Sequence, residues 1–251
     1  MPLRMLLRAA VLFLTPCLPG AVLAADEPLS AVESDAGIGL ELATLVRSYE
    51  VGGVQVDGRG PVGGVHGYVQ WGPGFRAEGR LLTGSVDHER PDPDSTSSVV
   101  LGEARATLGT ATERDVRLYA GFGARQLLAD SPFGSGDTSS WLAYLPFGAA
   151  SAGQLRPGWR ALVTIEGRFV LAGRDEIDDV LGIGDASFDR AGGWGAAVSV
   201  QFRNAAAGVG IEPFLRYLRP ADSERETVGA SSVRLADADG GTAGLRLTWA
   251  F

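Results

Sequence analysis

The sequence predicts an all-β fold: a ten-stranded antiparallel up-and-down transmembrane β-barrel with short turns at one end and longer loops at the other. Ten segments alternate apolar and polar residues, and this period of two is typical of strands with one apolar face. Each segment is about as long as the roughly ten residues that a tilted strand needs to cross a bilayer. The connections are alternately short and long, as in membrane barrels.

The first five predicted strands place apolar side chains on the lipid side and polar ones in the lumen. They cover residues 38–49, 62–71, 75–87, 98–109 and 115–128. Their apolar faces contain, in order, Ile38, Leu40 and Leu42; Val65, Val69 and Trp71; Phe75, Ala77 and Leu81; Val100, Ala104 and Leu108; and Val116, Leu118 and Phe122. Polar residues occupy the alternate positions, so each segment has the two faces of a barrel strand.

The last five predicted strands cover residues 141–150, 159–173, 194–203, 209–218 and 242–251. The first of these is the weakest, because Pro146 cannot donate a ladder hydrogen bond and predicts a distortion. The others have clear apolar faces, namely Val163, Ile165 and Phe169; Trp194, Val198 and Phe202; Ile211, Leu215 and Tyr217; and Leu245, Leu247 and Trp249.

The connections follow the same alternation. The short ones lie around Pro73 and at residues 111–114, 154–158 and 204–208, and the longer ones at 50–61, 88–97, 129–140, 174–193 and 219–241. The tryptophans fall at strand ends on apolar faces, where an amphipathic ring prefers the lipid–water interface. Trp71, Trp159 and Trp249 lie at the short-turn end, and Trp141 and Trp194 lie at the other. The sequence therefore predicts two aromatic girdles.

The final strand resembles the assembly signal of Gram-negative outer-membrane barrels. The resemblance rests on Thr242, Gly244, Leu247, Trp249 and the aromatic Phe251. A last strand that pairs with the first leaves no open edge in lipid. Over residues 37–251 the pattern resembles outer-membrane β-barrel proteins, in detail a set of uncharacterised ten-stranded barrels, matched best at 75–87, 144–148, 212–217 and the last strand. This resemblance implies fold and outer-membrane location, with the short turns periplasmic, but no activity.

The first residues predict export. Arg4 and Arg8 precede an apolar run at 9–14, and small residues up to Ala24 form a cleavage site, so residues 1–24 read as a signal peptide. Residues 25–36 read as a polar periplasmic lead-in. The single cysteine, Cys17, lies within the signal peptide; Pro16 before it disfavours a lipoprotein anchor. The net charge of −8 argues against a nucleic-acid partner, and no cofactor is expected.

The predicted lumen is rich in charge. Its network is expected to contain Glu41, Arg47, Arg76, Glu78, Arg80, Glu103, Arg105, Arg117, Arg125, Arg160, Glu166, Arg168, Glu212, Arg216 and Arg246, with Arg203 also facing inward. A barrel of about eight strands is just filled by side chains, and buried charges must pair. The pattern favours a hydrated salt-bridge plug; an excess of arginine leaves a narrow anion-preferring pore as an alternative.

Candidate catalytic chemistry is sparse. Omptin proteases, also ten-stranded barrels, use acidic pairs and an Asp–His pair in their outer loops. Asp92 and Asp94 lie in such a loop, but the two histidines, His66 and His88, lie on an inward face and at a loop start. A general base of suitable pKa is therefore not in place. The outer Asp-rich segments lack a full calcium-loop motif and read as solvated loops, with bridging of divalent ions to surface polysaccharide as the alternative.

These observations predict a non-enzymatic outer-membrane barrel with acidic outer loops that serves surface binding, adhesion or envelope integrity. The alternatives are a narrow anion channel or small-solute transporter and, third, an omptin-like protease or a lipid-modifying enzyme. No catalytic, metal or cofactor residues are assigned. The expected partners are outer-membrane lipids, lipopolysaccharide and the barrel-assembly machinery, and the surface ligand is not identified.

Overall fold

The described residues of the computed structural model, 35–72, 74–90, 95–111, 116–131, 136–180, 184–228 and 231–251, form twelve β-strands. Ten are long: β1 (Asp35–Val51), β2 (Val54–Trp71), β3 (Phe75–Arg90), β4 (Thr96–Ala111), β5 (Val116–Asp130), β6 (Asp137–Arg156), β7 (Trp159–Ile177), β9 (Gly193–Asn204), β10 (Val209–Pro220) and β12 (Ser231–Ala250). Two are short: β8 (Ala186–Arg190) and β11 (Arg225–Val228). No helix among them has the length and apolar character to span a membrane.

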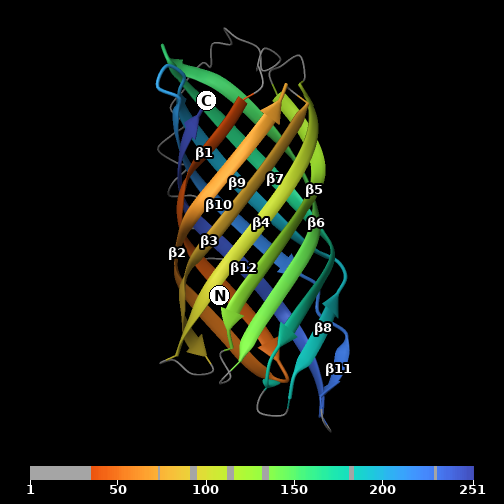
Figure 1. Ribbon diagram of the computed structural model, residues 1–251. Coiled ribbons are helices and arrows are strands. Elements are labelled where there is room, and N and C mark those ends of the chain that lie inside the picture. Colours follow the sequence, from red (N-terminus) through yellow and green to blue (C-terminus); the bar gives the residue numbers. More distant parts are fainter. Residues whose placement is uncertain are drawn as a thin grey trace.

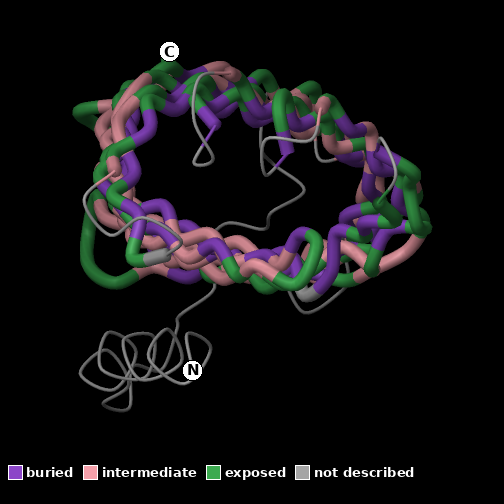
Figure 2. Tube along the Cα trace, turned by 90° about the horizontal axis from the view of Figure 1, so that it is seen from below, coloured by how far each residue is buried: buried purple, intermediate pink, exposed green. Residues whose placement is uncertain are grey.

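The ten long strands form a closed antiparallel barrel (Figure 1). Each pairs with the next along the chain, β7 pairs with β9, and β12 pairs with both β10 and β1. The closing pair runs from Gly37 opposite Ala250 to Val51 opposite Leu235. Figure 2, seen along the barrel, shows the resulting ring. The predicted ten-stranded up-and-down barrel is confirmed.

The outer face of the barrel is apolar and exposed. Leu42, Leu108 and Ile165 are 70%, 67% and 64% exposed, a degree of exposure that would be unfavourable over so wide a surface in water. Lipid chains cover such a face in an outer-membrane barrel. The alternation assigned from the sequence is therefore correct for the lipid side, and the chain has a transmembrane barrel fold.

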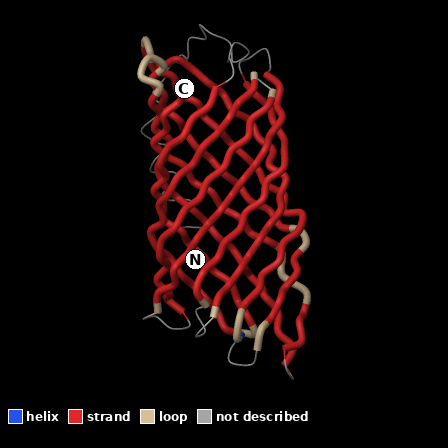
Figure 3. The backbone as a smooth tube through the Cα atoms, in the orientation of Figure 1, coloured by secondary structure: helices blue, strands red, loops and turns tan. Residues whose placement is uncertain are grey.

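The strands continue further at the outer end than the sequence predicted. The connection expected at 50–61 is a tight turn at Gly52 and Gly53, whose φ angles of 57° and 86° suit a two-residue hairpin. Strands also extend into the other long connections, because β3 continues to Arg90, β5 to Asp130 and β7 to Ile177 (Figure 3). The short β8 pairs with β7 and β11 with β12, so these hairpins project beyond the ring at the lower end of Figure 1.

An apolar cluster stiffens these outer hairpins. We call it the outer cluster; its largest members are Tyr49, Val51, Val56, Ile177, Val180, Phe188, Val228, Val233 and Leu235. Burial of such side chains stabilises by about 1.5–3 kcal/mol each. The alternating valines beyond Arg47 explain why the strands continue where the sequence suggested loops.

Two expectations concern the chain start. The signal peptide at 1–24 and most of the lead-in lie outside the described residues. Strand β1 begins at Asp35, so Asp35 and Ala36, expected in the lead-in, already pair with Gln70 and Val69.

Pro146 lies at an irregular part of the sheet. On one side, β5 pairs with β6 on both sides of this proline, with Ala120 opposite Phe147 and Gly123 opposite Tyr144. No residue of β5 is paired with Pro146 itself. On the other side the β6–β7 register shifts between Ala143 and Tyr144. The missing N–H of proline thus falls where the ladder is interrupted.

Candidate functional site

The lumen is crossed by one connected network of carboxylates and guanidinium groups. Its carboxylates are Glu41, Glu78, Glu103, Glu166 and Glu212, and its arginines are Arg76, Arg80, Arg105, Arg168, Arg216 and Arg246. Every one of these residues was assigned to the lumen from the sequence. The structure brings them together, and we call this set the lumen network.

Part of the lumen network follows from strand register. On the β3–β4 pair, Glu78 lies opposite Arg105 and Arg80 opposite Glu103. Residues directly opposite in antiparallel strands have Cβ atoms within about 5.5 Å, so these ion pairs are local. Arg80 Nη2 lies 2.6 Å from Glu103 Oε2, and the Arg105 and Glu78 side chains are in contact.

Other ion pairs span the lumen and join strands that are not neighbours. Arg80 on β3 donates to Glu41 on β1 at 2.6 Å. Arg168 on β7 donates to Glu103 on β4 at 2.8 Å. Arg105 on β4 reaches Glu166 on β7. These cross-lumen contacts join the local pairs into one network.

Tyrosines complete the lumen network, and the sequence analysis missed them. Tyr119 donates its hydroxyl to Glu166 at 2.9 Å, and Tyr144 donates to Glu103. The guanidinium carbon of Arg168 also lies 4.8 Å from the centroid of the Tyr144 ring, within cation–π range. The alternation of the sequence places both tyrosines at inward-facing positions. A tyrosine in a barrel strand is also common on the lipid side, so this position alone did not identify them.

The remaining predicted lumenal arginines lie outside the lumen network. Arg117 Nη2 donates to the carbonyl of Gly74 at 3.4 Å near the short-turn end. Arg160 occupies the same end, opposite Gln154 and Arg203. Arg47 and Arg125 line a separate cavity toward the outer end. The lumen network is thus smaller than the set expected from the sequence.

Side chains leave little space around the lumen network. Two cavities lined by described network residues measure about 20 Å³ each, enough for a water molecule or two. Glu41, Arg80, Glu103, Glu166 and Arg168 are all buried. Every carboxylate of the lumen network has an ionic partner in this confined space.

The expected assembly signal forms the closing seam of the barrel. Thr242 and Gly244 face the lumen, whereas Leu247 and Trp249 lie on the lipid side opposite Leu40 and Ile38 of β1. The terminal Phe251 exchanges two backbone hydrogen bonds with Ala36, of 2.8 and 3.2 Å.

The girdle tryptophans point to the lipid side. Trp71, Trp141, Trp194 and Trp249 are 43–55% exposed, and Trp159 is partly exposed. Trp71 contacts Phe75 at the short-turn end, and Trp194 contacts Tyr217 at the outer end, with ring centroids 5.2 and 5.3 Å apart.

The two histidines are held by hydroxyl groups in different parts of the barrel. His66 Nε2 lies 3.2 Å from Thr248 Oγ1 in the lumen, and His88 Nε2 lies 2.7 Å from Ser97 Oγ near the outer end. Asp92 and Asp94 lie outside the described residues. Within the described part of the chain, no three His, Cys, Asp or Glu side chains are grouped to hold a metal ion.

Comparison with known proteins gives a likeness of fold. No family model and no curated protein matches the chain. Among solved structures, the outer membrane protease OmpT from Escherichia coli aligns with a TM-score of 0.52 at 11% identity, covering 87% of this chain and 96% of that one. OprG from Pseudomonas aeruginosa aligns with a TM-score of 0.37 at 12% identity, covering 89% and 99%. The fold is that of Gram-negative outer-membrane β-barrels.

Proposed function

We propose that this chain is a non-enzymatic outer-membrane barrel, closed by its lumen network, that presents a rigid acidic outer surface for binding, adhesion or envelope integrity. The observation that carries the proposal is the lumen network, because a connected set of buried ion pairs suits a plug better than a conduit. We also propose export with removal of residues 1–24, assembly by the barrel-assembly machinery, and contact with lipopolysaccharide in the membrane.

The outer hairpins support the surface role. Their exposed carboxylates, in the described residues, are Asp87, Glu89, Asp130, Asp137, Glu176, Asp178, Asp179, Asp185, Asp189, Asp222, Glu224 and Glu226; their exposed arginines are Arg59, Arg174, Arg219, Arg225 and Arg234. The acidic groups are in excess, and the outer cluster beneath them fixes their positions. A preformed surface loses less conformational entropy on binding than a mobile loop.

The absence of an assigned base supports the non-enzymatic role. His66 is enclosed in the lumen beside Thr248, and His88 is bonded to Ser97. A general base must lie within hydrogen-bond reach of the proton that it takes, and Nε2 of His66 faces the hydroxyl group of Thr248 inside the lumen.

Conductance in a planar bilayer tests the plug. The refolded parent protein should give no current steps, because Arg80 and Arg168 cross the lumen. The double variant Arg80→Ala and Arg168→Ala removes both crossing side chains and should conduct, which also shows that reconstitution works. If the parent protein gave anion-selective current steps, the proposal of a plug would be wrong and the lumen would be an anion channel.

A further inference from the structure

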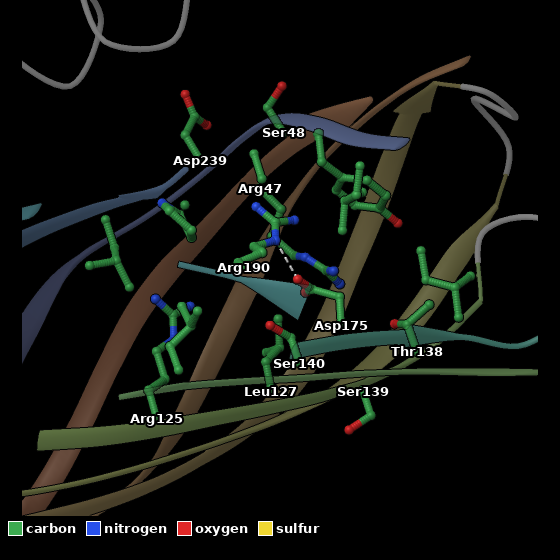
Figure 4. A pocket seen from close by; sticks show the side chains of 18 of the residues that line it. Arg47, Ser48, Arg125, Leu127, Thr138, Ser139, Ser140, Asp175, Arg190 and Asp239 are labelled. Carbon is green, nitrogen blue, oxygen red and sulfur yellow. Dashed lines mark ion pairs between the residues drawn. The ribbon is translucent and has the colours of Figure 1, made fainter. Parts of the chain in front are cut away.

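A second lumenal feature lies toward the outer end, apart from the lumen network. It is a cavity of about 70 Å³ between β1, β5, β6, β7, β8, β10 and β12. Figure 4 shows that Arg47, Arg125 and Arg190 contribute to its wall, together with Asp175. We call it the outer cavity. All the residues used below are described by the structure.

The outer cavity carries unbalanced positive charge. Asp175 Oδ2 lies 2.5 Å from Arg190 Nε, so these two groups neutralise each other. Arg47 and Arg125 then remain, and the lumen-facing charge is three arginines minus one aspartate, or +2. Like charges in a confined space repel and are costly unless an anion or water compensates them.

The two other carboxylates that line the outer cavity point elsewhere, and Glu103, which lies opposite Arg125 on the β4–β5 pair, is already engaged by Arg80 and Arg168. Glu176 is exposed and lies 3.7 Å from Arg174 on the outer face. Asp239 lies opposite Ser48 and accepts a hydrogen bond of 3.3 Å from the hydroxyl of Tyr217. Both residues occupy positions whose side chains face outward in the alternation of their strands. Neither carboxylate therefore compensates the positive charge of Arg47 and Arg125.

Arg47 and Arg125 converge from different walls. Arg125 extends from β5 until its Nη2 atom is 3.9 Å from the place that a Cβ on Gly240 would occupy. Gly240 lies directly opposite Arg47 on the β1–β12 pair. Within the described part of the chain, neither guanidinium lies within ion-pair distance of a carboxylate. The guanidinium of Arg125 therefore reaches across to the β1–β12 pair beside Arg47.

Tyr49 provides an independent sign of a missing ligand. Its side chain lines the outer cavity and is only 7% exposed. Its hydroxyl is buried and has no hydrogen-bond partner among the described residues. The guanidinium carbon of Arg47 lies 5.3 Å from the ring centroid. Since buried hydroxyl groups are normally satisfied, an acceptor belongs in the space beside it.

We propose that the outer cavity binds an oxyanion group, a phosphate or a carboxylate, through Arg47, Arg125 and the hydroxyl of Tyr49. Guanidinium groups match the paired oxygens of such anions and form charge-assisted hydrogen bonds. The volume admits several water molecules and therefore a single tetrahedral group. The ligand is carried by a small solute or by the phosphate of a surface glycolipid, and the site does not depend on whether the barrel conducts.

Calorimetric titration of the refolded full chain with inorganic phosphate in neutral detergent tests the site, with chloride at equal ionic strength as the reference. Arg47→Gln and Arg125→Gln should each weaken binding about tenfold or more, as expected for a hydrogen bond to a charged group. Tyr49→Phe should weaken it about two- to tenfold. Because that hydroxyl has no partner, Tyr49→Phe should leave the ligand-free unfolding temperature unchanged.

Arg117→Gln is the matched control, since it removes one lumenal positive charge at the opposite end. It should bind phosphate as the parent does. Lipopolysaccharide vesicles that compete with phosphate would identify a glycolipid source, and vesicles that do not compete would identify a small solute. A parent that binds phosphate no better than chloride, or an Arg117→Gln variant as weak as Arg125→Gln, would overturn the proposal. Heat-modifiable gel mobility verifies that each variant is folded.

Discussion

Glu103 is the residue on which the lumen network converges. It accepts hydrogen bonds from Arg80 at 2.7 Å, from Arg168 at 2.8 Å and from Tyr144, and Arg216 Nη1 lies 3.6 Å away. Its side chain is buried. The three arginines come from three different strands, so a single carboxylate holds together groups that would otherwise repel one another.

Replacement of Glu103 should therefore be costly. Glu103→Ala leaves buried guanidinium charge without its partner, and such a loss typically costs about 3–5 kcal/mol, less if water enters. The heat-modifiable gel transition should move to lower temperature. Glu176→Ala, which removes an exposed carboxylate from a surface pair, should cost at most about 1 kcal/mol. Equal transitions in both variants would show that the lumen network contributes no stability.

Gly123 makes room for one donor to Glu103. A Cβ at this position would overlap the ring of Tyr144, which lies directly opposite on the β5–β6 pair. Gly123→Ala should displace the Tyr144 hydroxyl from Glu103 and destabilise the barrel by about 1–3 kcal/mol, the usual cost of overpacking.

The chain offers a matched control for this glycine. A Cβ on Gly102 meets no atom within 4 Å, so Gly102→Ala should leave the unfolding temperature unchanged or slightly raised. Combining Gly123→Ala with Tyr144→Ala should recover part of the steric cost. If Gly123→Ala were as stable as the parent, the close approach of Tyr144 would not matter.

At the scale of elements, a tyrosine ring also packs over a glycine of the neighbouring strand at two other places in the barrel. Tyr68 lies over Gly37 across β1 and β2, and Tyr119 lies over Gly148 across β5 and β6. An aromatic ring over a cross-strand glycine covers exposed backbone and fixes register. These tyrosines therefore serve both the sheet and, for Tyr119, the lumen network.

The terminal strand should be essential for closure. Deleting Phe251 removes its two backbone bonds to Ala36, and Trp249→Asp places a charge on the lipid side, where charge is unfavourable. Both variants should accumulate unfolded, as shown by loss of heat-modifiable mobility and of surface exposure in cells. Leu155→Asp, an exposed apolar site in the hairpin between β6 and β7, is the control and should fold. Normal folding of both terminal variants would remove the role of β12 as an assembly signal.

At the scale of the molecule, the net charge is −8, but positive and negative side chains are concentrated in different parts of the barrel. Arginines are concentrated in the lumen, and carboxylates predominate on the outer hairpins. The lumen network pairs six arginines with five glutamates, and the outer cavity adds an excess of two positive charges toward the outer end. The acidic rim above that cavity opposes the approach of anions from the outside.

Periodicity predicted the barrel because inward and outward positions alternate strictly, as Glu166 and Ile165 illustrate. It placed the lumen charges correctly but not their partners, since the contact between Arg80 and Glu41 depends on barrel curvature and on strands that do not pair. It ended the strands too early at the outer end, because Gly52 and Gly53 between Val51 and Val54 read as part of a loop. The orphan hydroxyl of Tyr49 cannot be recognised without coordinates.

The pairing of Glu41 with Arg246 has a consequence for how the barrel forms. These residues are 205 positions apart in the chain and 2.7 Å apart in space, on the two strands that close the ring. A partly inserted open sheet would lack this ion pair and would expose its charged lumenal face to lipid, which is strongly unfavourable. Contacts between such distant residues also form slowly. Insertion should therefore proceed with few stable intermediates, and the barrel should become committed to the membrane only when its first and last strands meet.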